Sequence, residues 1–282
     1  MKFGRIGALG AEIPVAKVND TVYDLRSITA DITPEFLGNN PVGAVNAALA
    51  TLPVVDGAED QRFGAPIAGP PNIYCVGMNY AAHAREGGAE PPKQIVMFMK
   101  PVHTLAGPND DFAAPAGWEK IDWEVELALV IGKRAWQVGA DENGLDYIAG
   151  YATANDISER EWQLERSLGQ WSKGKSGPGF LPFGPWIVSA DSVDPSDLRL
   201  QSFVNGEPRQ DSRTSDLIFP VDTIIKDLSQ FTVLEPGDIV LTGTPEGVAL
   251  SGRFPYVQVG DVMEIEVEGL GRQRQLTVAL EG

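Results

Sequence analysis

The feature that most constrains the fold is the segment 121–130, which reads Ile-Asp-Trp-Glu-Val-Glu-Leu-Ala-Leu-Val. Bulky apolar residues dominate it and an Ile-Gly pair ends it, a pattern typical of a buried β-strand. Side chains alternate along a strand, so Glu124 and Glu126 share one face, while Val125 and Leu127 point into a core. Two half-buried carboxylates repel each other, and a hard divalent cation is the simplest counter-charge. The alternative is an exposed face with solvated carboxylates.

Composition narrows the possible partners. The chain has 282 residues and a formal net charge of −17, which disfavours nucleic acid and anionic membranes but leaves room for a small anionic substrate near a local cation. A single Cys75 and two histidines exclude an internal disulfide, a cysteine-rich zinc site and a three-histidine zinc site. No apolar run approaches 18 residues and no signal peptide is recognised, so we expect a cytoplasmic protein without membrane contact.

The chain divides into a small N-terminal part and a larger remainder. Two apolar runs around Asn19-Asp20 predict a hairpin, and helices are expected from Thr33 and over 42–52. A Gly- and Pro-rich stretch, 64–71, indicates a linker. We therefore predict a small N-terminal α+β domain over residues 1–68 and a β-rich, mixed α/β domain over residues 69–282.

A possible general base lies in the segment 78–88, where high Ala content favours a short helix. His83 and Glu86 are three residues apart and share a helical face, and a carboxylate beside an imidazole orients it and raises its basicity. The glycine pair at 87–88 would let the helix move as a lid. The alternative is an incidental surface pair.

A third carboxylate follows the next predicted strand, 151–157, which ends in Asn155-Asp156. Ser158 is predicted to begin a helix that continues to about residue 168 and carries Arg160 and Gln163 on roughly one side. Asp156 at this strand-to-helix junction is either a ligand or a backbone cap.

Two loops add groups that can bind an anion. In the Gly- and Pro-rich segment 170–185, Lys173 and Lys175 flank a glycine and either point at an anion or lie in solvent. In the segment 242–248, hydroxyls and amides around Gly243 and Thr244 either hold a carboxylate or form a plain turn. Elsewhere, Asn205-Gly206 predicts a hairpin turn, 215–230 has helical spacing interrupted by Pro220, and 262–280 closes the chain as a further antiparallel hairpin.

From about residue 73 onward, the sequence resembles the fumarylacetoacetate hydrolase family. Several unlinked motifs occur in the family's order, which makes the resemblance specific. They are Gly77-Met78-Asn79-Tyr80 with His83 and Glu86, the run 122–127, Asn155-Asp156 with Arg160 and Gln163, the run 173–176, Gly184-Pro185-Trp186, Asn205-Gly206 and the run 242–248.

The resemblance implies a mixed β-sandwich roll that assembles as a homodimer. It implies that Glu124, Glu126 and Asp156 hold Mg²⁺ or Mn²⁺, that His83 and Glu86 form the catalytic dyad, and that Lys175 is the catalytic lysine. Substrate contacts are expected from a set of five residues: Tyr80, Arg160, Gln163, Gly243 and Thr244.

The sequence also departs from the family at two places near the expected pocket. Gly177-Pro178-Gly179-Phe180 stands where many relatives carry Asp-Thr-Phe, and Ala249-Leu250-Ser251 precedes Gly252 where many relatives follow Gly-Val with Gly. Both bear on substrate identity.

Within the family, the runs 170–176 and 184–186 resemble the branch that acts on 2,4-diketo-3-deoxy sugar acids. This implies hydrolysis of the C3–C4 bond of a 2,4-dioxo acid, such as 2,4-didehydro-3-deoxy-L-rhamnonate or fuconate, to pyruvate and an acid such as L-lactate. The alternatives are an oxaloacetate decarboxylase, an enzyme similar to ureidoglycolate lyases, and a catalytically silent binding protein.

Overall fold

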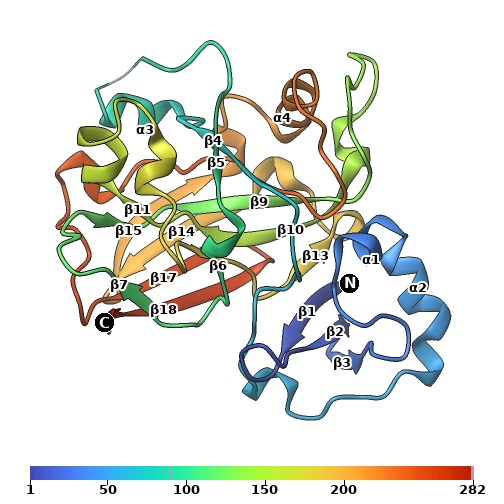
Figure 1. Cartoon of the computed structure of the whole chain (residues 1–282). Coiled ribbons are helices and arrows are strands. Elements are labelled where there is room, and N and C mark those ends of the chain that lie inside the picture. The colour runs from blue at the N-terminus through green and yellow to red at the C-terminus, as the bar shows by residue number, and fades with distance from the viewer. Residues whose placement is uncertain (89, 281–282) are drawn as a thin grey trace.

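Two β-sheets organise the computed structural model, which describes residues 1–88 and 90–280 (Figure 1). The larger sheet has the order β3-β2-β1-β13-β10-β9-β16-β4-β5 and the smaller has the order β15-β14-β17-β18-β7. The strands of the larger sheet are β1 (Lys2–Ile6), β2 (Ile13–Val18), β3 (Thr21–Asp24), β4 (Ile73–Gly77), β5 (Val96–Lys100), β9 (Val125–Ile131), β10 (Ile148–Asn155), β13 (Ile187–Ser189) and β16 (Ile239–Leu241). Those of the smaller sheet are β7 (Phe112–Ala114), β14 (Arg199–Val204), β15 (Glu207–Arg213), β17 (Val262–Val267) and β18 (Gly271–Ala279).

Short elements surround these sheets. Two two-stranded ladders are formed by β8 (Ile121–Asp122) with β11 (Ser158–Glu159), and by β6 (Leu105–Ala106) with β12 (Leu181–Pro182). The α-helices are α1 (Pro34–Gly38), α2 (Pro41–Ala48), α3 (Ala81–Glu86) and α4 (Val221–Leu228). A π-helix, η5 (Glu161–Glu165), and the 3-10 turns η1 (Leu49–Thr51), η2 (Ala58–Asp60), η3 (Val102–Thr104), η4 (Gly144–Tyr147), η6 (Trp171–Gly174), η7 (Ala190–Ser192), η8 (Pro195–Asp197), η9 (Thr214–Asp216) and η10 (Ala249–Ser251) complete the fold.

The core lies on both faces of strand β9. Val125, Leu127 and Leu129 belong to a buried cluster that includes residues of β14 and β17 in the smaller sheet. Ala128 and Val130, on the opposite face, belong to a second buried cluster. The predicted alternation along this strand is therefore confirmed, and the face that carries Glu124 and Glu126 is also interior.

The predicted continuous strand over residues 121–130 is wrong in one respect, because it is interrupted at Trp123-Glu124. Residues 121–122 pair with β11 in a separate ladder. The Trp123 indole is buried and donates a hydrogen bond to the Gly247 carbonyl, and the Glu124 amide donates to the Asn155 side chain instead of a strand backbone. Side-chain partners thus replace the ladder at this point.

The predicted helix from Ser158 to residue 168 is also wrong. Ser158 and Glu159 pair with β8, and a π-helix occupies only Glu161–Glu165. The Glu159 carboxylate, rather than Ser158, accepts a hydrogen bond from the Trp162 amide. Tertiary pairing with residues 121–122 outweighs the local capping signal.

A local effect, the interruption at Pro220, shortens the helix predicted over 215–230, which begins only after Pro220 and ends at Leu228. Proline suits the start of a helix because its missing N–H would have no partner there.

The N-terminal strands extend the larger sheet, because β1 pairs with β13 (Figure 1). The predicted hairpins at Asn19 and Asn205 are confirmed, and both asparagines have the positive φ that their turns require. The β-rich, mixed sandwich-roll class is also confirmed, whereas the domain boundary between residues 68 and 69 stays a prediction. In the described part of the chain, no helix is long and apolar enough to cross a membrane.

We expect Leu127→Ala to lower the free energy of unfolding by about 2–5 kcal/mol, because it leaves a cavity between the two sheets. Val259→Ala is the control, since Val259 is exposed and its loss should change stability by less than about 0.5 kcal/mol. Denaturant unfolding measures both. Equal stability of the two variants would contradict the placement of Leu127 in the shared core.

Candidate active site

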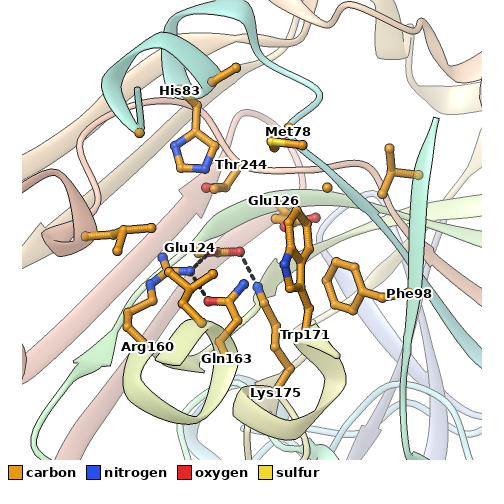
Figure 2. Close-up of a pocket in the computed structure, with 16 residues that line it drawn as sticks. Met78, His83, Phe98, Glu124, Glu126, Arg160, Gln163, Trp171, Lys175 and Thr244 are labelled. Carbon is orange, nitrogen blue, oxygen red and sulfur yellow. Dashed lines mark hydrogen bonds and ion pairs between the residues drawn. The ribbon is translucent and has the colours of Figure 1, made fainter. Parts of the chain in front are cut away.

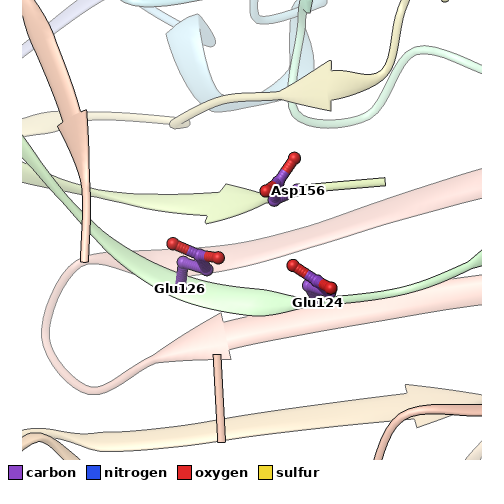
Figure 3. Close-up of side chains that lie close together, drawn as sticks. All are labelled: Glu124, Glu126 and Asp156. Carbon is purple, nitrogen blue, oxygen red and sulfur yellow. The ribbon is translucent and has the colours of Figure 1, made fainter. Parts of the chain in front are cut away.

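Three buried carboxylates lie close together at the ends of two neighbouring strands (Figure 3). Glu124 precedes β9, Glu126 lies within it, and Asp156 follows β10. The antiparallel register pairs Asn155 with Val125, which brings the three side chains together. Their nearest oxygens lie within 4.8 Å of one another.

Three cations form ion pairs with two of these carboxylates, Glu124 and Asp156. The Lys175 ammonium donates to Glu124 Oε2 at 2.7 Å and to Asp156 Oδ2 at 2.6 Å. The Lys100 ammonium contacts Asp156 Oδ1 at 2.5 Å, and Arg160 Nη1 lies 2.8 Å from Glu124 Oε1. Such pairing stabilises the charges of Glu124 and Asp156 in the protein interior, whereas Glu126 has no ion pair among the described residues.

The two glutamates differ in their electrostatic environment. Burial alone would raise the pKa of Glu124, but Lys175 and Arg160 outweigh burial and bring the pKa to about 2. Burial raises the pKa of Glu126 well above its usual range, and the neighbouring carboxylates of Asp156 and Glu124 raise it further. Of the two glutamates, Glu126 is therefore the one that gains more from an added positive charge.

Lys175 is a charged group in this site. Burial would lower its pKa, but the carboxylates of Asp156 and Glu124 reverse that effect and raise it. An ammonium held in this way stabilises negative charge and is not a nucleophile. Lys173, by contrast, is exposed and donates to the Arg166 carbonyl, so the structure separates the two lysines of this loop.

These groups form part of a cavity of about 170 Å³ (Figure 2). Seven of the residues predicted for the site line it, namely His83, Glu124, Glu126, Arg160, Gln163, Lys175 and Thr244. The other four predicted residues, Tyr80, Glu86, Asp156 and Gly243, are not part of the lining within the described chain. Asp156 lies next to it, in contact with Lys175.

The His83–Glu86 pair has the expected proximity but not a hydrogen bond. His83 Nδ1 and Glu86 Oε2 are 4.0 Å apart, and His83 Nδ1 is buried without a partner among the described residues. Glu86 instead accepts a hydrogen bond from the Gly247 amide at 2.9 Å and lies 3.3 Å from Arg253 Nη1. Glu86 thus joins helix α3 to the 247–253 segment, and the dyad role stays a prediction.

The loop at 242–248 is held against β9 by a buried glutamine. Gln210, from β15, accepts from the Val125 amide at 3.0 Å and donates to Thr244 Oγ1 at 2.8 Å. Thr244 Oγ1 in turn donates to the Val125 carbonyl at 2.9 Å. Because its one proton is used there, the Thr244 hydroxyl offers a ligand a lone pair rather than a proton.

Gly243 and Tyr80 support the site from behind. The Gly243 amide donates to Glu126 Oε2 at 2.7 Å, which orients that carboxylate. Tyr80 is buried, and its hydroxyl has no partner among the described residues.

Sequence reasoning missed three contributors. Lys100 was not expected, although a lysine that directly ends an apolar strand is a signal of a buried cation. Asp122 accepts from Arg160 Nε at 2.8 Å and fixes that side chain. Phe98 and Trp171, at 5.8 Å between ring centroids, form an aromatic wall, and their pairing has no signal in the sequence.

The three carboxylates fit a hard divalent cation. They supply oxygen donors of the type that Mg²⁺ and Mn²⁺ prefer, and each oxygen retains a second lone pair beside its protein partner. The raised pKa of Glu126 indicates that the existing cations do not fully compensate the cluster. Glu124, Glu126 and Asp156 are therefore suited to bind one.

Residues 72–278 match the family described as fumarylacetoacetate (FAA) hydrolase, C-terminal. A protein of Sphingomonas sp. strain SKA58 named 2,4-didehydro-3-deoxy-L-rhamnonate hydrolase is 42% identical over 280 residues, which cover 98% of this chain and 95% of that protein. The chain belongs to the fumarylacetoacetate hydrolase family, and this confirms the resemblance found in the sequence.

Solved structures agree with that assignment. Fumarylacetoacetate hydrolase from Exiguobacterium antarcticum has a TM-score of 0.85 and is 33% identical, with 99% of this chain and 100% of that chain covered. Maleylpyruvate hydrolase from Sphingobium sp. SYK-6, in complex with manganese(II) and pyruvate, has a TM-score of 0.82 at 29% identity, with both chains fully covered.

We expect Glu126→Gln to weaken Mg²⁺ or Mn²⁺ binding by at least tenfold while leaving the fold intact, because it removes one charge and keeps an acceptor for the Gly243 amide. Alanine at Glu124 or Asp156 should abolish metal binding. These two changes also leave buried cations unpaired, so they should lower the free energy of unfolding. Calorimetry measures affinity, with Glu161→Gln outside the cluster as control. Unchanged affinity in all three site variants would exclude this metal site.

Proposed function

We propose that this protein is a divalent-metal-dependent hydrolase that cleaves the C3–C4 bond of a 2,4-dioxo acid, giving pyruvate and a second carboxylic acid. The observation that carries the proposal is one cavity lined by two carboxylates of a buried acidic triad, two fixed cations and an imidazole, with the third carboxylate, Asp156, next to it. The substrate to try first is 2,4-didehydro-3-deoxy-L-rhamnonate or the corresponding fuconate, with L-lactate as the second product. The 42% identical Sphingomonas relative is named for the rhamnonate.

The carboxylates of Glu124, Glu126 and Asp156 would hold the cation. Once bound, Mg²⁺ or Mn²⁺ supplies Lewis-acid polarisation of the 2-oxo acid end of the substrate. The remaining work is done by side chains that already line the cavity.

His83 is placed to act as the general base. Burial lowers its pKa, so the imidazole is neutral near pH 7 and can accept a proton from water. The water oxygen then bonds to C4. Figure 2 shows His83 on one side of the cavity, facing the groups around Glu124 across open space.

The bond cleavage requires a place for the electron pair of the C3–C4 bond. That pair moves toward C3 and the 2-oxo group as an enolate, while C4 leaves as the second carboxylic acid. Lys175 and Arg160 are fixed cations that line the cavity, and we assign them the stabilisation of this enolate, because pre-oriented charges of this kind commonly give the largest catalytic effect. Protonation at C3 completes pyruvate.

Oxaloacetate decarboxylation is the main alternative, because it forms the same enolate without an attacking water. Activity of the ureidoglycolate lyase kind, or a silent binding role, would show as no pyruvate release from any dioxo acid although metal is bound. We further propose that the protein acts on a small 2-oxo or 2,4-dioxo acid and that it is a cytoplasmic homodimer.

We expect His83→Ala to reduce hydrolysis of a 2,4-dioxo acid by roughly 10²–10⁴-fold, the usual contribution of a general base. Oxaloacetate decarboxylation should fall much less, because it needs no deprotonated water. Coupled detection of pyruvate with Mg²⁺ measures both reactions, and Glu126→Gln, which acts on the metal site, should reduce both. Full hydrolysis by His83→Ala would mean that another group activates water.

The pH dependence gives an independent check on His83. Its pKa is lowered from 6.5 by burial, so the neutral base still predominates at pH 6.5 and half of it is lost only at a lower pH. We expect the acid limb of kcat/KM for hydrolysis to be centred below pH 6.5. The residual activity of His83→Gln should lack this acid limb. A limb centred above pH 6.5 that disappears in the variant would contradict the assignment.

A further inference from the structure

The cavity is lined both by charged groups and by apolar side chains. The apolar ones are Val76, Met78, Phe98, Leu164, Trp171 and Leu250. Figure 2 shows Phe98 and Trp171 on the side opposite Arg160. Gly77 leaves the space that the indole of Trp171 fills, since a Cβ there would collide with the ring. The Trp171 ring is thus packed against β4.

The cations that line the cavity are already engaged. Lys175 is paired with Glu124 and Asp156, and Arg160 with Asp122 and Glu124. Among the described lining residues, neither lysine nor arginine remains for a second carboxylate on a ligand.

Arg253 lies just beyond the lining, and it is engaged as well. Its guanidinium pairs with Glu86 and lies 5.3 Å from the centroid of the Phe254 ring. The cavity and its immediate border thus offer a second carboxylate on a ligand no unpaired lysine or arginine among the described residues.

Leu250 is held at the edge of the cavity by Asp122, the same carboxylate that fixes Arg160. The amides of Ala249 and Leu250 donate to Asp122 at 2.8 and 2.9 Å, and Arg160 Nε donates to Asp122 at 2.8 Å. Leu250 is half-buried, so a ligand can reach it. This residue belongs to the short insertion at which the sequence departs from the family pattern. Leu164, on η5, is 43% exposed and also borders the cavity.

We propose that Leu250, together with Leu164, makes the enzyme selective for 2,4-dioxo acids whose acyl group ends in a methyl and excludes those that end in a second carboxylate. The inference rests on the proposed function and names the substrate class for that site. Burying a methyl against these leucines is favourable, whereas a carboxylate there loses its hydration without gaining a counter-charge.

The test uses two substrates of equal length, 2,4-dioxoheptanoate and 2,4-dioxoheptanedioate, which differ only in a terminal methyl or carboxylate. We expect kcat/KM to favour the heptanoate by on the order of 10²-fold, because an unpaired polar group in an apolar site is strongly rejected. Leu250→Arg should lower this ratio to less than about tenfold or reverse it, because it supplies the missing charge.

Leu168→Arg is the matched control. Leu168 is fully exposed and does not line the cavity, so an arginine there adds the same charge to the protein without entering the cavity. The ratio should stay as in the wild type. A similar change in both variants would mean that net charge, not the leucine wall, sets the preference, and would overturn the proposal.

Binding separates this inference from the proposed reaction. The pair 2-oxoheptanoate and 2-oxoheptanedioate lacks the C4 carbonyl, so calorimetry with Mg²⁺ reports selectivity without cleavage. We expect tighter binding of the heptanoate and a loss of that preference in Leu250→Arg. Equal binding of the two acids by the wild type overturns the inference, even if hydrolysis occurs. A clear binding preference without hydrolysis of either dioxo acid supports the selectivity assigned to Leu250 and Leu164 and refutes the proposed reaction.

Discussion

The ion pairs of Lys175 are the interaction on which the site depends. Its ammonium lies between Glu124 and Asp156, which come from the ends of two antiparallel strands. Moving these charges out of water is costly, and only close mutual contact makes the arrangement stable. Lys100 and Arg160 complete the compensation from the far sides of the same carboxylates. The lysine loop, η5 and the two strands are therefore fixed relative to one another by charge.

Hydrogen bonds connect the ion-paired carboxylates to the loop at 242–248. Gln210 connects the backbone between the two glutamates to Thr244, and the Gly243 amide orients Glu126. Gln210 belongs to the smaller sheet, so the packing of the two sheets and the geometry of the site are coupled. A fully satisfied buried polar network of this kind holds one arrangement, because every alternative leaves a donor or acceptor unpaired.

Helix α3 has a different relation to the site. Glu86 binds the 247–253 segment through the Gly247 amide and Arg253, and this holds His83 over the cavity without a hydrogen bond between the two side chains. Glu86 can orient the imidazole only after a small movement that gives up part of these contacts. The same segment carries Leu250, so the position of helix α3 and the position of Leu250 in the cavity lining are connected.

The sequence by itself determined the alternation along β9, the hairpins at Asn19 and Asn205, the three carboxylates and the family, because strand periodicity, turn chemistry and linear motifs are local properties. It failed at Ser158, where a capping pattern predicted a helix and pairing with residues 121–122 produced a strand. Only the tertiary structure brought Lys100 to Asp156, turned Glu86 toward Gly247, and placed Leu250 and Trp171 at the same cavity. The first two of these contacts join residues that are 56 and 161 positions apart, and no local pattern encodes which distant partner will satisfy a buried charge.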